Sequence, residues 1–123
     1  MVEIQASSPH RQKLVCVVDD DEQLNQTLCT LIKSRAYDVL GFKSADEFLL
    51  WFHEKNQECD LIVSDINMPG SSGYDLCREV RRIPLASRIP VILVTGSDPG
   101  NEKAVGIEVG ADDFIQKPFQ SRE

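Results

Sequence analysis

The sequence has no long hydrophobic run, and none of its apolar stretches approaches the ~20 residues that a helix needs to cross a bilayer. Its first residues, Met1 to Lys13, contain no apolar core of the kind that secretory signal peptides have. We therefore expect a cytoplasmic protein that does not enter a membrane. With 123 residues, 41% of them hydrophobic, the chain is long enough for one domain with a real core and too short for two.

Histidine and paired cysteine are scarce, which leaves little material for a zinc site. The two histidines, His10 and His53, fall in a polar leader and on a predicted helix. The four cysteines are scattered without a C-x-x-C pair; they are Cys16, Cys29, Cys59 and Cys77. That scatter favours isolated buried thiols over the alternative of a metal or redox role.

Positive charge is also in short supply. Against 20 Asp and Glu residues the chain has 13 Lys and Arg, which gives a formal net charge of -7. This balance argues against binding to nucleic acid or to an anionic membrane surface, so neither is a predicted partner. An acidic surface would suit a cation site, although acidic charge is mostly a matter of solubility.

The stretch from Asp60 to Gly70 combines a strand, a carboxylate and a turn. The apolar run 61–63 shows no alternation, which predicts a strand buried on both faces. Asp65 ends this strand, and the Met-Pro-Gly sequence at 68–70 must then turn. Because the carboxyl ends of parallel strands face the crevice where ligands bind, Asp65 is expected at the mouth of a site.

Predicted strands and helices alternate along the chain. We expect strands at 13–18, 37–42, 61–65, 91–94 and 113–116, and helices at about 22–35, 45–55, 73–82 and 101–109. This alternation predicts a parallel sheet with right-handed crossovers and helices on both faces. We predict an α/β fold: a flavodoxin-like, doubly wound, five-stranded parallel sheet in the order 2-1-3-4-5. Residues 1–12 would be a flexible leader and 13–123 the domain.

Glycine and charge mark the weaker elements. Asp38 and Gly41 interrupt the second strand, which we place at an edge of the sheet. Gly106 lies inside the fourth helix and costs about 1 kcal/mol relative to alanine, so this helix should be the least stable. In the first helix an apolar stripe is expected to face inward; it consists of Leu24, Leu28, Leu31 and Ile32. The second helix should begin with a capping box formed by Ser44 and Glu47.

A fifth helix should follow Phe119 to cover one face of the sheet, but the sequence shows none, so the final helix is expected to be missing or truncated. A domain without it would expose apolar surface on the first and fifth strands and on the first helix. We expect dimerisation, as a possible homodimer, or marginal stability in this form.

Polar side chains follow four of the predicted strands. Asp19 and Asp20 follow the first strand, Asp65 ends the third, Thr95 follows the fourth and Lys117 the fifth. Three carboxylates in one crevice repel each other, which raises a pKa or requires a cation such as Mg²⁺. A metal-bound aspartate can be a nucleophile that forms an aspartyl-phosphate. The Thr95 hydroxyl and the Lys117 ammonium would then bind phosphoryl oxygens.

Each of these residues also has a plainer interpretation. Lys117 could be a surface lysine, Thr95 a turn residue and Asp20 a helix cap. Their combination at four strand ends favours a shared site.

Four stretches of the chain resemble the receiver domain of two-component response regulators. They are Val17–Asp21, Asp65–Pro69 with Gly73, Val94–Gly96 and Gly110–Phe119. The resemblance extends over about residues 13–119, nearly the whole chain.

The resemblance implies a phosphorylation-dependent signalling switch, not an enzyme, because such a domain catalyses only its own phosphorylation and dephosphorylation. Asp65 would accept the phosphoryl group from a sensor histidine kinase or a phosphotransfer protein. Mg²⁺, for which Mn²⁺ can substitute, would be bound by Asp20, Asp65 and the backbone carbonyl of Asn67. Asp19 would act mainly through a metal-bound water.

The resemblance also implies a route from the phosphoryl group to an output domain that follows this segment. Thr95 and Lys117 would hold the phosphoryl group, and Thr95 would couple to Phe114, where relatives often have tyrosine. Phenylalanine has no hydroxyl, so an inward ring gains no hydrogen bond at its tip, and plain packing is the alternative role. The added charge, about -1.5 to -2, should act on the fourth helix and on the loop from Thr95 to Asn101. The Lys117–Pro118 bond is expected to be cis.

Two other classes of function compete with this interpretation. A Mg²⁺-dependent phosphatase with an aspartate nucleophile would need a second acid two residues later, where Asn67 stands. A pseudo-receiver that only binds partners would have lost Asp20, Asp65 or Lys117, and all of these are present.

Overall fold

In the computed structural model, which describes residues 12–96 and 105–117, five strands form one parallel sheet in the order β2-β1-β3-β4-β5. The strands are β1 (Leu14–Val18), β2 (Asp38–Phe42), β3 (Leu61–Asp65), β4 (Val91–Thr95) and β5 (Asp113–Gln116). The helices are α1 (Glu22–Lys33), α2 (Ala45–Lys55) and α3 (Gly73–Arg82), with a further helical segment at 105–109. The predicted flavodoxin-like fold and its strand order are confirmed.

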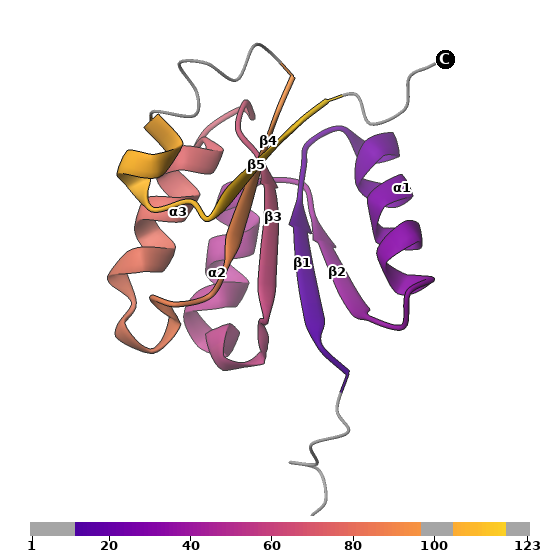
Figure 1. The fold of residues 1–123 in the computed structure, drawn as a ribbon, viewed down its shortest axis with the longest axis horizontal. Coiled ribbons are helices and arrows are strands. Elements are labelled where there is room, and N and C mark those ends of the chain that lie inside the picture. Colours follow the sequence, from indigo (N-terminus) through magenta and orange to yellow (C-terminus); the bar gives the residue numbers. More distant parts are fainter. Residues whose placement is uncertain (1–11, 97–104, 118–123) are drawn as a thin grey trace, which may run out of the picture.

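Helices cover the two faces of the sheet unequally (Figure 1). Within the described ranges, one face is packed against α1, and the other against α2, α3 and the segment 105–109. The main core lies under α2 and α3, and its fully buried large side chains include Phe48, Phe52, Ile62, Leu76, Val80 and Leu93. β1 is buried along its whole length because it lies between β2 and β3 in the middle of the layers.

The prediction that β3 is buried on both faces is wrong. Ile62 is fully buried, but Leu61 and Val63 are only half-buried, because they face the side of α1, which packs against β1 and β2. Leu31, predicted to face inward, is 56% exposed. Leu31, Leu61 and Val63 line a groove of about 670 Å³ together with Val15, Ile32 and Tyr37.

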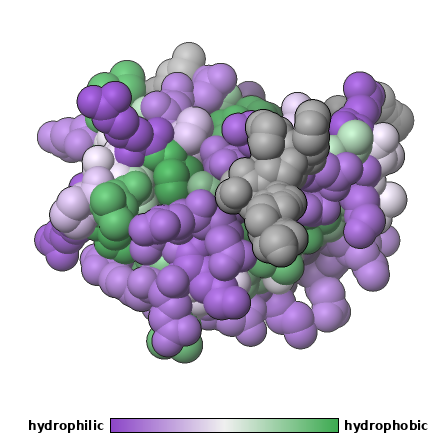
Figure 2. Space-filling model, turned by 90° about the horizontal axis from the view of Figure 1, so that it is seen from below, coloured by the Kyte–Doolittle hydropathy of each residue, from purple (hydrophilic) through white to green (hydrophobic). Residues whose placement is uncertain are grey.

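The end of the molecule at which the strands begin has a largely hydrophilic surface with separate hydrophobic areas (Figure 2). Among the described residues, no helix has the length and apolar character needed to cross a membrane.

The helices α1, α2 and α3 begin where the sequence predicted, but one predicted capping interaction differs. Ser44 caps α2 by accepting the N–H of Glu47 at 3.0 Å, but the Glu47 carboxylate accepts the N–H of Lys43, not that of Ser44. The predicted capping box at this helix is therefore wrong, since its second bond is displaced by one residue. A complete capping box occurs at α3, between Ser72 and Asp75.

Several predictions fall on residues outside the described ranges. These are the leader up to residue 11, the loop and the helix start between 97 and 104, the peptide bond to Pro118, and the segment after it.

Candidate functional site

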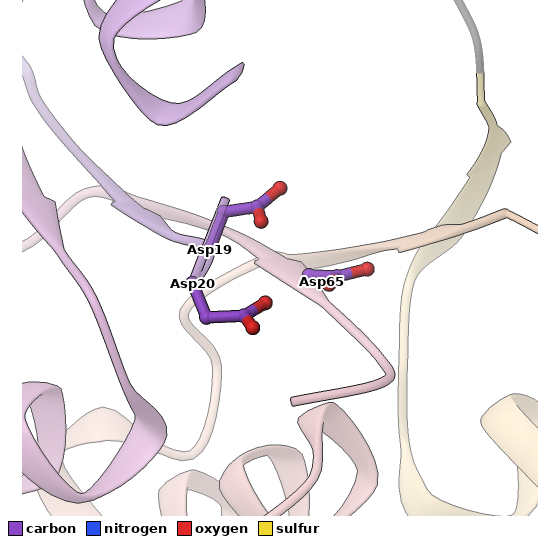
Figure 3. A group of neighbouring side chains, drawn as sticks. All are labelled: Asp19, Asp20 and Asp65. Atoms are coloured by element: carbon purple, nitrogen blue, oxygen red, sulfur yellow. The ribbon is translucent and has the colours of Figure 1, made fainter. Parts of the chain in front are cut away.

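Three carboxylates meet at the carboxyl ends of β1 and β3. Asp19 and Asp20 follow the last residue of β1, and Asp65 is the last residue of β3. Each offers an oxygen within 4.8 Å of the others, and the three side chains point in the same general direction (Figure 3). Asp19 and Asp65 are buried, whereas Asp20 is exposed.

Lys117 reaches the same place from the end of β5. Its Nζ lies 3.4 Å from Asp19 Oδ2 and 3.3 Å from Asp65 Oδ1. The backbone holds it there, because the N–H of Lys117 donates to the carbonyl of Thr95 at 2.7 Å and so extends the pairing of β5 with β4. The structure thus brings together four of the side chains that the sequence placed at one crevice.

Burial and charge act on these groups in opposite directions. Burial raises the pKa of Asp19, although the N–H of Asp21 and the ammonium of Lys117 lower it in part. Burial and the Asp19 carboxylate raise the pKa of Asp65, again against Lys117. Burial lowers the pKa of Lys117, but the carboxylates of Asp65 and Asp19 outweigh it, so this pKa lies above its ordinary value. The site therefore carries more negative charge than its one ammonium balances.

The other residues predicted for the site lie at the β3–α3 connection and at the end of β4. The N–H of Gly73 donates to the Ile66 carbonyl at 2.9 Å, and a Cβ on Gly73 would overlap the carbonyl oxygen of Asp65. Only glycine lets α3 begin this close to the end of β3. Asn67 lies exposed in the turn between them, and Thr95 is fully buried at the end of β4.

A family model described as "Response regulator receiver domain" matches residues 15–123. The chain belongs to the response regulator receiver domain family. Receiver domains are regulatory phosphoacceptor domains of two-component systems, so membership implies a phosphorylation-dependent signalling switch.

Solved structures agree with the family match. A response regulator receiver protein from Pseudomonas putida is 31% identical, with a TM-score of 0.80 and coverage of 89% of each chain. A putative response regulator from Chloroflexus aurantiacus is 30% identical, with a TM-score of 0.83 and coverage of 89% of this receiver domain and 88% of that chain. The chemotaxis protein CheY4 of Vibrio cholerae is 26% identical, with a TM-score of 0.83 and coverage of 89% and 90%.

The donor atoms of this receiver domain fit a hard divalent cation. Receiver domains bind Mg²⁺ at an acidic pocket, and the cluster of Asp19, Asp20 and Asp65 supplies the carboxylate oxygens that Mg²⁺ and Mn²⁺ prefer. Burial is the largest cause of the raised pKa of both Asp19 and Asp65, and the neighbouring carboxylates raise each pKa further, so a bound cation would lower the cost of ionising them.

Phe114, the predicted switch residue, packs against the helical segment 105–109. A Cβ on Gly106 would overlap the Phe114 ring, so the ring rests where an alanine methyl group would otherwise stand. The ring is half-buried against the main core.

Asn25 was missed by the sequence analysis. It is 8% exposed, and its side-chain amide donates to the backbone carbonyls of Asp19 and Phe42. The sequence held one weak signal, a polar residue beside the apolar stripe of the first helix. That Asn25 lies opposite Gly41 of β2 is visible only in the structure.

Proposed function

We propose that this receiver domain is a switch in which Asp65 accepts a phosphoryl group from a phosphohistidine of a sensor histidine kinase or phosphotransfer protein. The observation that carries the proposal is the position of Asp65: a buried carboxylate at a strand end, 3.3 Å from the Lys117 ammonium and beside two further carboxylates. A carboxylate oxygen of Asp65 attacks the phosphorus, the bond from phosphorus to the histidine nitrogen breaks, and the imidazole leaves.

Some of the residues around Asp65 would bind the metal ion, and others would bind the phosphoryl oxygens. Asp20, Asp65 and the backbone carbonyl of Asn67 would hold Mg²⁺, with Asp19 acting mainly through a bound water. When bound, the ion neutralises charge on the transferring phosphoryl group. Lys117 already pairs with Asp65 and exchanges this contact for a phosphoryl oxygen, and the Thr95 hydroxyl donates to another.

The proposed output face includes the helical segment 105–109 and Phe114. The loop from Thr95 to Asn101 was predicted to belong to it, but most of that loop lies outside the described residues. The negative charge added at Asp65 draws Thr95 inward and lets Phe114 move away from Gly106. Amide exchange at 105–114 should change when a phosphate mimic such as beryllofluoride binds with Mg²⁺. Exchange that stays the same there would contradict this output route.

The partners and boundaries are part of the same proposal. The receiver domain spans 13–123 after a short leader, works in the cytoplasm, and controls an output domain or partner through the face that includes 105–114. A homodimer stays a prediction. It was argued from apolar surface expected on the first and fifth strands and on the first helix; Leu31 on α1 and Ile115 on β5 are exposed, but the expectation is wrong for β1, which is buried along its whole length.

Acetyl phosphate with Mg²⁺ provides the direct test. Wild type should take up one phosphoryl group per chain at Asp65, and Asp65→Asn should take up none, because an amide is a poor nucleophile. Asp38→Asn removes an exposed carboxylate on β2 and should label like wild type. Chelation of Mg²⁺ should abolish labelling.

Other outcomes separate the competing functions. Continuous turnover of many small phosphate esters would support a phosphatase instead. Absence of labelling in the wild type would support a partner-binding scaffold.

A further inference from the structure

Asn25 on α1 ties together the ends of two strands. Its Nδ2 donates to the carbonyl of Asp19 at 3.0 Å and to the carbonyl of Phe42 at 2.8 Å. The Phe42 carbonyl also accepts the N–H of Asp19 at 3.0 Å. One buried amide therefore joins Asp19, the residue that follows β1, to Phe42, the last residue of β2.

The other end of the Asn25 side chain is fixed as well. The Cys29 thiol donates to Asn25 Oδ1 at 3.4 Å. Gly41 leaves the room that Oδ1 needs, because a Cβ at that position would stand 2.5 Å from it. Both amide hydrogens and the amide oxygen of Asn25 thus have partners, so the side chain has one orientation in this place.

These contacts determine how Asp19 and Asp20 are presented. Asp19 is held at its N–H, at its carbonyl, and at Oδ1, which accepts the N–H of Asp21 at 2.9 Å. Its Oδ2 faces Lys117 Nζ, at 3.4 Å. Since the peptide bond is planar, fixing the Asp19 carbonyl also fixes the plane from which Asp20 continues.

We infer that Asn25, with Gly41 behind it, is a positioning residue for the metal and phosphoryl site. The inference rests on the proposed function, because it concerns how well the carboxylates of Asp19 and Asp20 bind the ion. A purely structural bond between α1 and β1 would affect the stability of the protein but not the Mg²⁺ affinity of the folded protein. Groups that orient metal ligands typically change metal affinity by about 10–100-fold when removed.

The test compares Asn25→Ala and Asn25→Leu with wild type. Mg²⁺ affinity is measured by titration calorimetry and Mn²⁺ affinity by electron paramagnetic resonance, at a temperature where circular dichroism shows every variant folded. We expect binding about 10-fold weaker in both variants. Leu28→Ala shortens a half-buried apolar side chain on the same helix and serves as the control for general loosening of α1, with unchanged affinity.

Gly41→Ala approaches the same contact from β2 and keeps the test open if an Asn25 variant does not fold. Its methyl group displaces Asn25 Oδ1, so we expect weaker Mg²⁺ binding here too. Wild-type affinity in the folded Asn25 or Gly41 variants would overturn the inference, whatever their melting temperatures. A wild type that binds no Mg²⁺, or an Asp65→Asn variant that binds it as tightly, would instead overturn the proposed site.

Discussion

Asp65 weakens the fold that it serves. Its pKa is raised by burial and by Asp19, so the folded protein holds the Asp65 proton more tightly than the unfolded chain does. Ionising Asp65 therefore costs folding free energy. The contribution of Asp65 to stability is fully present below its ordinary pKa near 3.8 and is lost as the pH rises through the raised value.

Asp65→Asn should consequently stabilise the protein in the absence of divalent cations. The amide cannot ionise, and Lys117 keeps Asp19 as its partner at 3.4 Å. At pH 7 with a chelator we expect a gain of about 1 kcal/mol in the free energy of unfolding, measured by urea denaturation. The gain should shrink as the pH falls toward 3.8, the ordinary pKa.

Asp38→Asn, which removes an exposed carboxylate on β2, provides the control and should leave the free energy of unfolding at pH 7 nearly unchanged. An Asp65→Asn variant less stable than wild type at pH 7 would mean that the pairing with Lys117 outweighs the cost of burial.

The acidic site could be predicted at the residue scale, and its support could not. Asp19, Asp65 and Lys117 converge because each stands at the carboxyl end of a parallel strand, and strand ends are visible in the hydrophobic pattern. Asn25 acts through backbone carbonyls of Asp19 and Phe42, which every residue possesses. The sequence marks Asn25 only as a polar residue beside the apolar stripe of the first helix, and no side-chain pattern says which backbone carbonyls it reaches.

At the scale of elements, the helical segment 105–109 and β5 make a close contact at Gly106 and the Phe114 ring. From the sequence Gly106 is only a weakness of this helix, because glycine disfavours helices. In the structure the same glycine admits the Phe114 ring. Helix propensity and packing therefore oppose each other at this position.

A double-mutant cycle separates these two effects. In a Phe114→Ala background, Gly106→Ala should stabilise the protein by about 1 kcal/mol, the gain in helix propensity. With Phe114 present, the gain should fall or reverse, because the new methyl group displaces the ring; we expect a coupling of about 1 kcal/mol. The measurement is urea denaturation of the four proteins.

Ile107, which is 73% exposed on the same segment, provides the control for this cycle. Ile107→Ala should have the same effect with and without the Phe114 ring. Equal effects of Gly106→Ala in both backgrounds would show that the ring does not depend on the glycine.

For the whole molecule, hydrophobic pattern predicted the sheet but not how completely it is covered. The apolar run of β3 does not alternate with polar residues, so it predicted that both faces of this strand are buried. Leu61 and Val63 nevertheless remain half-buried on the α1 side. A strand's own sequence does not say which element will cover each face, because that depends on contacts with distant parts of a chain.

Binding of Mg²⁺ should stabilise the whole domain in a pH-dependent way. A ligand that binds only the folded state adds about 2.7 kcal/mol at a concentration 100 times its Kd. Protons compete for the same carboxylates, and burial raises the pKa of both Asp19 and Asp65. The stabilisation should therefore be full at neutral pH and decline as the pH falls through these raised values.

Melting temperatures with Mg²⁺ and with a chelator, at matched ionic strength and several pH values, measure this stabilisation. Asp65→Asn should lose most of the effect; an equal rise in that variant would show general screening of the net charge of -7 instead of a site.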